Sequence, residues 1–415
     1  MKINFLNNII MFLLVSSTGG LLFVYNRNQA FLILFLTILF ALFYIGDKIK
    51  KRVYYSSLLS FCLILLLFVI NFIFAINPQS LTKYSFFGIS IFTTVLTLFY
   101  YSNQDNKLAF VNSLYSILKL ILFHSLVSFG AYYFVKNNLF LITSEYHDSL
   151  TFNYFFYYSP KIGNTINLFG FDIHRNAGMF WEPGILQAYL NILFFLELSF
   201  FNKNRVLLFL IIIAIISTYS TTGLFLLIIQ VIYFTQKNYK KTIAPLLFVI
   251  LVVPLYFLFN LNMSDKIGGE SDGSFQKRLV DLTQPFFIAL EHPLTGVGLD
   301  LDRFQEVREE FYINTNINNI LGIVGIQQNV ETTSKGSTNS VMYLLAGMGF
   351  PTTILFIYML IKQHIINKDR LIWFIIIFVS VMSEPLLLRP FFFLFTVAGF
   401  VSFFSKITGR KKKLA

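Results

Sequence analysis

Charged residues are scarce in this chain, and their scarcity excludes an ordinary soluble protein. Asp, Glu, Lys and Arg make up only 13% of the residues, whereas 56% are hydrophobic and 18% are aromatic. A soluble domain carries roughly a quarter charged residues, and the mean hydropathy here is +0.68. The composition therefore predicts an integral membrane protein.

Cysteine is almost absent as well. Cys62 is the single cysteine, so a disulfide within the chain and a cluster of thiolate metal ligands are both excluded. Cys62 lies in the middle of an apolar run, where a packing role is the simplest interpretation. No cofactor and no metal are predicted.

Long apolar runs recur along the chain, and they lack the alternating pattern of β-barrel strands. A helix of about 17 to 25 residues crosses a hydrocarbon core about 30 Å thick. The sequence thus predicts an all-α integral membrane protein with about 12 transmembrane helices in one polytopic domain over residues 1–415. The expected spans are 5–25, 30–46, 53–76, 84–101, 108–135, 177–201, 206–219, 222–235, 243–260, 340–361, 371–382 and 385–405, of which those from Val206, Thr222 and Leu371 are short, so that each is either longer than drawn or re-entrant.

Lys and Arg orient these helices, because cytoplasmic loops carry an excess of them. With the basic C-terminal segment inside, the other basic loops also fall inside, including 47–52. Both termini are then cytoplasmic, and two large loops, 136–176 and 261–339, are extracytoplasmic. The net charge of +12 reflects this topology, so no nucleic-acid partner is predicted.

The two large loops are too long to be simple connectors, so the chemistry is expected there. Within 261–339, Phe275, Leu279 and Leu282 have helical spacing and predict a short amphipathic helix. A second helix is predicted from Leu301, with Asp300 as its N-cap. The Asn- and Thr-rich segment that follows has the composition of a lid or substrate-guiding loop.

The stretch "HRNAGMFWEPG" predicts an anion site at a helix entrance. Pro183 is favoured at the first helical position, which puts Glu182 at the mouth of the helix. The helix N-terminus attracts phosphate, and Arg175 adds a bidentate donor. Glu182 is then a candidate general base. The alternative is a simple salt bridge between Arg175 and Glu182 that anchors the helix end.

A second "EP" occurs in "SEPLLLRP". Glu384 precedes Pro385 at the predicted mouth of the last span, and Arg389 is expected about one turn inside it. A buried arginine costs about 2.5 to 3.5 kcal/mol on insertion scales, so Arg389 and Glu384 are candidate substrate-binding residues. The alternative is that Arg389 extends to the interface.

Arg278 and His292 flank Pro285 in the second loop. Arg278 is a candidate phosphate ligand, and His292 is a candidate base near neutral pH or a hydrogen-bonding loop residue. "DLD" (Asp300 to Asp302) has the form of a metal-binding DxD motif, but N-capping explains Asp300 without a metal. Gly296 and Gly298 follow no predicted strand, so they predict a turn.

Taken in order, "RNAGMFWEPG", "STYSTTGLFLLIIQ", "RLVDLTQPFFIALEHPLTGVGLDLDRF" and "STNSVMYLLAGMGF" resemble the O-antigen polymerase and ligase superfamily. The resemblance covers about the C-terminal 60% of the chain. It implies a multi-pass protein of the bacterial cytoplasmic membrane that uses a polyprenyl-pyrophosphate-linked oligosaccharide, among membrane lipids, without a cofactor or metal. A chain-length regulator protein is a further partner that the resemblance brings into consideration.

The resemblance also implies roles for single residues. Arg175 and Arg278 would bind the pyrophosphate leaving group, while Glu182 or His292 would orient or deprotonate the acceptor hydroxyl. Ligases of the superfamily tend to have a histidine just before the "N-yl" helix, and here Ser337 and Thr338 precede it. This difference favours a polymerase of surface polysaccharide (O-antigen, capsule or exopolysaccharide) over a ligase.

Two further alternatives stay open from the sequence. A flippase or another transporter of lipid-linked oligosaccharide also has about twelve spans. Lys119 and Glu197 lie within predicted spans, but they do not form the chain of carboxylates expected of a proton-coupled transporter. A non-catalytic scaffold would tolerate the loss of Arg175, Arg278 and Arg389 together.

Overall fold

The chain forms a helical protein in a computed structural model. The structure describes residues 2–20, 25–46, 49–143, 148–158, 165–168, 171–201, 203–238, 244–266, 272–311 and 337–411. The chain divides into two compact units. The first comprises Met1–Ile33, Leu108–Ser271 and Ile366–Ser380, and the second comprises Leu34–Lys107, Asp272–Ile365 and Val381–Ala415.

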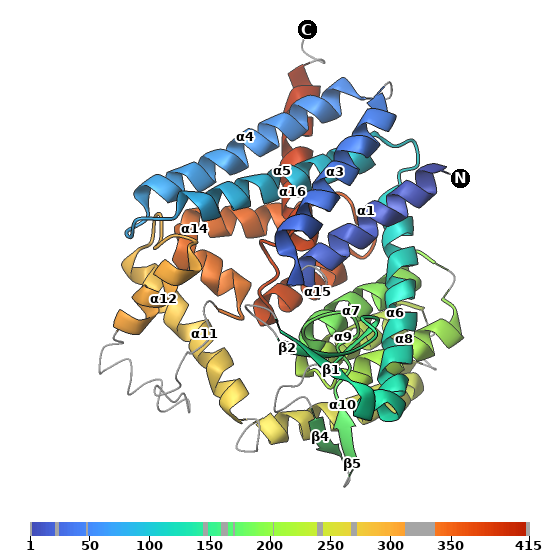
Figure 1. Cartoon of the computed structure of the whole chain (residues 1–415). Coiled ribbons are helices and arrows are strands. Elements are labelled where there is room, and N and C mark those ends of the chain that lie inside the picture. Colours follow the sequence, from blue (N-terminus) through green and yellow to red (C-terminus); the bar gives the residue numbers. More distant parts are fainter. Residues whose placement is uncertain are drawn as a thin grey trace. The chain divides into compact units, whose positions relative to one another are not determined.

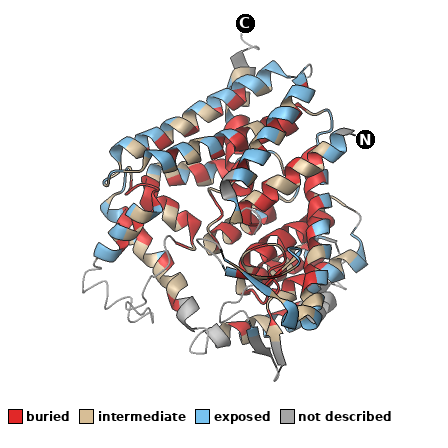
Figure 2. Cartoon of the chain, in the orientation of Figure 1, coloured by how far each residue is buried: buried red, intermediate tan, exposed pale blue. Residues whose placement is uncertain are grey.

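The first unit is built around α7, whose residues from Pro183 to Glu197 are all buried. This helix packs against α6, α8 and α9, α10 packs against α9, and α1 packs against α6. Figure 2 shows the buried ribbon of α7 among these neighbours. The bounds are α1 Lys2–Gly19, α6 Ala109–Val135, α7 Pro183–Ser199, α8 Arg205–Ser217, α9 Thr221–Asn238 and α10 Ala244–Lys266.

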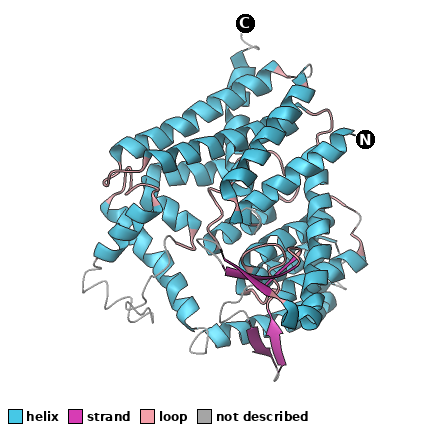
Figure 3. Cartoon of the chain, viewed as in Figure 1, coloured by secondary structure: helices cyan, strands magenta, loops and turns pink. Residues whose placement is uncertain are grey.

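Short strands follow α6 within the predicted loop 136–176, where the sequence predicts no strand. After the 3-10 turn η2 (Lys136–Asn138), three antiparallel strands form one sheet and two more form a hairpin. Figure 3 shows them as the only strand-coloured segments among the helices that it draws. The bounds are β1 Phe140–Thr143, β2 Asp148–Phe152, β3 Phe156–Tyr158, β4 Thr165–Leu168 and β5 Phe171–His174.

The second unit is a helical bundle. The helices α4, α5 and α16 pack on one another, α14 packs on α16, and α11 packs on α14; Figure 1 shows α4 and α5 running side by side. The boundary between the units falls within α3 (Arg27–Tyr44) and α15 (Arg370–Ser383). The bounds are α4 Lys51–Phe74, α5 Leu81–Asn103, α11 Asp272–Glu291, α12 Leu301–Glu310, α14 Ser340–Ile361 and α16 Pro390–Lys411.

Five helices among the described residues are long and apolar enough to cross a membrane: α4, α5, α6 with η2, α14 and α16. Six shorter apolar helices accompany them, including α7, α8 and α15. These findings confirm the all-α membrane class. The count of about twelve spans, the cytoplasmic termini and the sides of the loops stay predictions.

The second large loop contains more helix than predicted. The helix α10 runs to Lys266, beyond the predicted end at Asn260, and α11 has 20 residues where a short helix was predicted. Pro285 lies inside α11. The N-cap at Asp300 is confirmed, since its side chain accepts a hydrogen bond from the Asp302 amide.

The helix α14 is broken at Gly349, whose φ of 76° no other residue type adopts easily. Near the break, the carbonyls of Ala346 and Gly347 accept hydrogen bonds from the amides of Val297 and Gly298, both at 2.9 Å. The loop after α11 therefore docks on α14, as the turn predicted at Gly296 and Gly298 requires. Both glycines have positive φ, which confirms that turn.

Candidate functional site

Arg175 follows β5 in the first unit, and its guanidinium is fixed at the turn between α8 and α9. Its Nε donates to the carbonyl of Thr218 at 3.1 Å, and Thr218 is the C-cap of α8. The charge therefore stands beside the segment that leads into α9.

Asn176 holds this part of the chain in place. Its amide donates to the carbonyl of Ser217 at 2.9 Å. Its Nδ2 donates to the Ser125 carbonyl on α6 at 3.1 Å and to the Ser217 hydroxyl at 3.0 Å. Because Asn176 is buried and joins two helices, the position of its neighbour Arg175 is fixed by the packed core of the unit. No pattern in the sequence marked Asn176 as a site residue.

His174 forms an aromatic cluster beside Arg175. Its ring stacks on Tyr132 at 4.4 Å and meets Tyr158 edge-on at 5.6 Å. Burial lowers the pKa of His174 to about 4, and the Arg175 charge lowers it further in the same direction. The imidazole is therefore neutral at pH 7, and it places no second cation next to Arg175.

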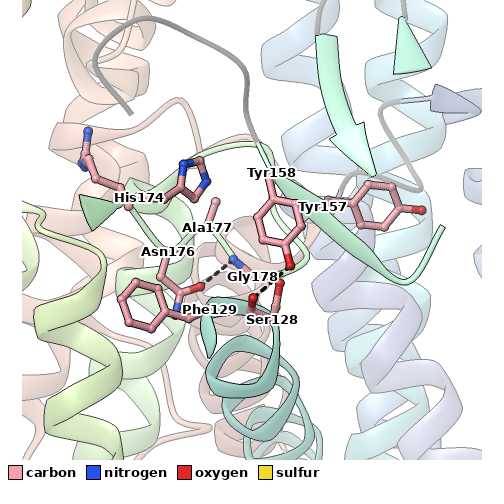
Figure 4. A pocket seen from close by; sticks show the side chains of 9 residues that line it. Ser128, Phe129, Tyr157, Tyr158, His174, Asn176, Ala177 and Gly178 are labelled. Atoms are coloured by element: carbon pink, nitrogen blue, oxygen red, sulfur yellow. Dashed lines mark hydrogen bonds between the residues drawn. The ribbon is translucent and has the colours of Figure 1, made fainter. Parts of the chain in front are cut away.

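A crevice lies at this cluster. Its lining includes Ser128, Phe129, Tyr157, His174 and Arg175. Figure 4 shows the aromatic rings around the crevice, with the Tyr158 hydroxyl donating to the Ser128 carbonyl at 2.9 Å. Aromatic side chains from the sheet thus border the Arg175 segment.

Glu182 is the N-cap residue of α7, and Pro183 is its first helical residue, as predicted. The Glu182 side chain does not cap the helix, and its backbone carbonyl accepts the amide of Ile185 at 3.2 Å. Within the described part of the chain, Glu182 forms no ion pair with Arg175. The alternative in which these two residues form a salt bridge is therefore not found.

Arg278 lies on α11 in the second unit and is partly exposed. It has no hydrogen bond or ion pair with any residue that the structure describes. One turn further along α11 lies Asp281, which is completely buried. A cation available to a ligand thus stands next to a buried carboxylate.

Asp281 is the centre of a buried polar cluster that sequence analysis missed. One carboxylate oxygen accepts from Arg308 Nη2 at 3.0 Å. The other accepts from the Thr338 amide at 2.9 Å and from its hydroxyl at 2.8 Å. The cluster joins α11, α12 and the segment just before α14, so it fixes the residues that stand where ligases of the superfamily tend to have histidine.

Arg308 completes the cluster. Its Nε donates to the Gln284 side chain at 2.8 Å, and Gln284 donates back to the Arg308 carbonyl at 2.9 Å. Burial lowers the pKa of Arg308, and the neighbouring Asp281 opposes this shift. The sequence carried one signal for this burial, because Arg308 lies four residues after the buried Phe304 on the same helical face.

His292 lies just after the end of α11. From Arg278 to His292 the helix advances about 20 Å along its axis. The structure therefore does not bring His292 to Arg278, although the two were predicted to serve one reaction. His292 instead opens the loop that docks on α14, where the amide of Phe350 donates to the Pro293 carbonyl at 2.8 Å.

Arg389 is not one turn inside the last helix, and that expectation was wrong. The helix α16 begins at Pro390, so Arg389 precedes it directly. Proline disfavours helical conformation in the residue before it and starts helices well, which explains the boundary. Arg389 acts electrostatically on the Tyr343 hydroxyl, which itself donates to the Leu299 carbonyl at 2.6 Å.

Glu384 is buried in the segment between α15 and α16. Its carbonyl accepts the hydroxyl of Ser340, and that hydroxyl accepts the amide of Leu386 at 2.8 Å. Glu384 therefore lies at the start of α14, in the same unit as Arg278 and Arg389. Arg175 and Glu182 belong to the first unit.

The described residues contain no group of three or more His, Cys, Asp or Glu side chains able to hold a metal ion. Asp300 and Asp302 of the "DLD" sequence both pair with Lys83. The cationic partner of these carboxylates is thus a lysine.

Comparison with known proteins identifies one family. The model of a family described as O-antigen ligase matches residues 206–357, a segment that includes Arg278, His292 and the Asp281 cluster. No curated protein and no solved structure matches the chain. The family match and the apolar helices agree with a membrane glycosyltransferase-like enzyme acting on lipid-linked oligosaccharide. The match over residues 206–357 supports membership of the O-antigen polymerase and ligase superfamily.

Proposed function

We propose that the protein polymerises lipid-linked repeat units of a surface polysaccharide at the outer face of the bacterial cytoplasmic membrane. The growing glycan leaves its polyprenyl pyrophosphate and is transferred to a sugar hydroxyl of a new lipid-linked repeat. The family match supports a polymerase or ligase type of activity in general.

One observation favours the polymerase. Thr338 stands where ligases of the superfamily tend to have a histidine, and both its amide and its hydroxyl are engaged by Asp281. This position therefore serves to hold α11 and α12 against the start of α14, and it offers no imidazole to activate a ligase acceptor.

Arg175 and Arg278 are assigned to the pyrophosphate. When the bond between the anomeric carbon and the pyrophosphate oxygen breaks, the leaving group takes the electron pair and gains negative charge. Guanidinium groups stabilise this charge through bidentate hydrogen bonds. Arg278 suits this role because, among the described residues, no carboxylate neutralises it. Arg389 and Glu384 are assigned to the binding of the substrate around the start of α14.

Glu182 is assigned to the acceptor. The hydroxyl oxygen of the acceptor forms the new bond to the anomeric carbon, and its proton passes to the Glu182 carboxylate. A positioned base of this kind is typically worth about 10² to 10⁴ in rate. Glu182 is partly exposed at the mouth of α7 and has no ion-pair partner in the described part of the chain. His292 stays a second candidate base.

The decisive experiment measures the length distribution of the surface polysaccharide, and of its lipid-linked precursor, in cells that lack the gene. Loss of long chains, with single repeats still reaching the surface, is the result expected of a polymerase. Long polymer retained on its lipid carrier would identify a ligase instead. An unchanged distribution would contradict both and return transport to consideration.

A further inference from the structure

The three-stranded sheet of the first unit lies alongside the second half of α6. The Tyr158 hydroxyl donates to the Ser128 carbonyl, and the Tyr158 ring contacts Tyr132 at 5.0 Å. At the other end of β3, the His124 ring stacks on Phe156 at 5.8 Å, and its Nε2 lies 2.7 Å from the Phe155 carbonyl. The turn between β2 and β3 therefore lies level with His124.

If α6 crosses the membrane, as its length and apolar character predict, this level lies within it. The 27 residues of α6 make a helix about 40 Å long, about 10 Å longer than a hydrocarbon core of about 30 Å. His124 precedes the helix end at Val135 by eleven residues, or about 16 Å. Even if the whole surplus of α6 projects beyond the membrane at the Val135 end, the turn lies about 6 Å inside the hydrocarbon boundary.

Strands at this depth cannot face lipid, because their free backbone groups would find no hydrogen-bond partner there. Non-helical backbone is tolerated at membrane depth only where it is buried in protein or lines a water-filled space. The turn nevertheless exposes two large rings, since Tyr154 is 65% and Phe155 is 72% exposed. Aromatic rings in a hydrated space are costly unless a ligand covers them.

The backbone conformation of Tyr154 also favours a ligand-binding role for the turn. Asn153 and Tyr154 both have positive φ, 50° and 59°, as a tight hairpin turn requires at its two central residues. Asparagine tolerates this conformation, and glycine is the usual second residue, whereas a bulky side chain there is an outlier. Contact of the Tyr154 ring with Phe140 at 5.3 Å holds it in place. Such outliers gather at ligand-binding sites.

The strand β3, which follows the turn, reaches the Arg175 crevice. Tyr157 and Tyr158 of β3 line that crevice together with His174 and Arg175, and Figure 4 shows the Tyr158 ring beside His174 while the Tyr157 ring extends away from it. In a lipid-linked glycan the first sugar is attached directly to the pyrophosphate. A pyrophosphate at Arg175 would therefore place the first sugar beside the residues of β3 that line the crevice.

We propose that the turn at residues 153–155 is a carbohydrate-binding platform, on which Tyr154 and Phe155 stack against sugar rings of the lipid-linked glycan. The apolar face of a sugar ring covers the aromatic surface, while water around the turn solvates the sugar hydroxyls. This assignment rests on the proposed function for the identity of the glycan.

The test uses single cysteines in a Cys62→Ser background, in proteoliposomes. Phe155→Cys is compared with Phe123→Cys, an exposed position of α6 that lies next to His124 and so at the same depth. A charged, membrane-impermeant thiol reagent should label residue 155 and leave residue 123 unlabelled. Repeat-unit oligosaccharide, released by mild acid from the lipid-linked precursor of the host cells, should slow labelling at 155 severalfold.

Equal labelling at 155 and 123, or labelling of 155 by apolar reagents alone, would overturn the platform. Labelling at 155 without protection by the oligosaccharide would also overturn it, and it would leave the polymerase assignment intact if cells lacking the gene still lose long chains. Protection at 155 together with an unchanged chain-length distribution in such cells would retain the platform and refute the polymerase.

Discussion

Arginine recognises a pyrophosphate through geometry as well as charge, because its planar fork donates two parallel hydrogen bonds. Arg175 is held by Thr218 and the buried Asn176, and Arg278 stands one turn from the buried Asp281. Both lie on segments whose backbone the core fixes. Small changes in these two side chains should therefore affect the reaction more than the fold.

Arg175→Lys and Arg278→Lys should each reduce polymerisation about 10-fold to 100-fold, because a charge-assisted hydrogen bond worth about 1.5 to 3 kcal/mol is lost. The measurement is the chain length of surface polysaccharide at matched protein levels. Arg303→Lys is the control, since Arg303 is exposed and pairs with Glu306 on its own helix. Full polymerisation by both variants would exclude bidentate pyrophosphate binding at these positions.

Removing Arg308 should destabilise the protein far more than removing Arg303. Arg308→Leu leaves the Asp281 charge buried without its partner, which typically costs about 3 to 5 kcal/mol, whereas the exposed Arg303 pair is worth about 0 to 1 kcal/mol. Thermal unfolding in detergent measures both. The double variant Asp281→Leu with Arg308→Leu should recover part of the loss, and an equal effect of the two single variants would contradict the buried pair.

Stability should fall as the pH decreases from 6.5 to 4, in part through His174. Its pKa is lowered to about 4 in the folded protein, so the unfolded chain takes up a proton in this window while the folded one does not. His174 contributes at most about 3 kcal/mol to the loss in free energy of unfolding. His174→Asn should flatten this part of the stability profile measured between pH 4 and 7. A profile that keeps its slope in the variant would rule out His174 as its cause.

Among the secondary-structure elements, the local signals in the sequence predicted helix ends well. Pro183 begins α7 and Asp300 caps α12, because each acts on backbone groups within one turn.

The buried pair of Asp281 and Arg308 was missed, since it joins residues 27 positions apart. The strands in 136–176 were missed as well. Strands of three to five residues contain too few alternations of apolar and polar residues to be recognised from the sequence. The last span was predicted to begin at Pro385, whereas α16 begins at Pro390. Between the two prolines the Arg389 amide donates to the Leu386 carbonyl in a turn.

Gly349→Ala should disrupt α14 and the loop that docks on it. The backbone has φ of 76°, and a Cβ atom there would lie 2.4 Å from the Leu294 carbonyl oxygen. Relief requires movement of backbone, so we expect a loss of stability of about 1 to 3 kcal/mol. Gly130→Ala in α6 is the control, because its Cβ would meet open space. A neutral Gly349→Ala would show that the break is not required.

At the scale of the whole molecule, composition decided the class of protein, while topology rests on the distribution of charges alone. The described helices include five of sufficient length and apolar character and six shorter apolar ones. For a short apolar helix, length and composition do not determine whether it crosses the membrane. The sides of the loops therefore need a direct measurement.

Cysteine accessibility in intact cells would provide it. In a Cys62→Ser background, Asn138→Cys at the end of η2 should react with a membrane-impermeant reagent from outside, since 136–176 is predicted to be extracytoplasmic. Lys203→Cys, in a predicted cytoplasmic loop, should react only after permeabilisation. The reverse pattern would invert the orientation and place Arg175 on the cytoplasmic side.

The break in α14 also has a consequence for how the protein is assembled. In hydrocarbon, backbone carbonyls without partners are costly, and those of Ala346 and Gly347 are bonded by the amides of Val297 and Gly298. Asn71 of α4 adds a second donor to the Gly347 carbonyl at 2.7 Å. The first half of α14 is thus incomplete when it leaves the insertion machinery. It reaches its final state only after the preceding loop and an earlier helix have come together around it, so correct biogenesis must bring all three segments together.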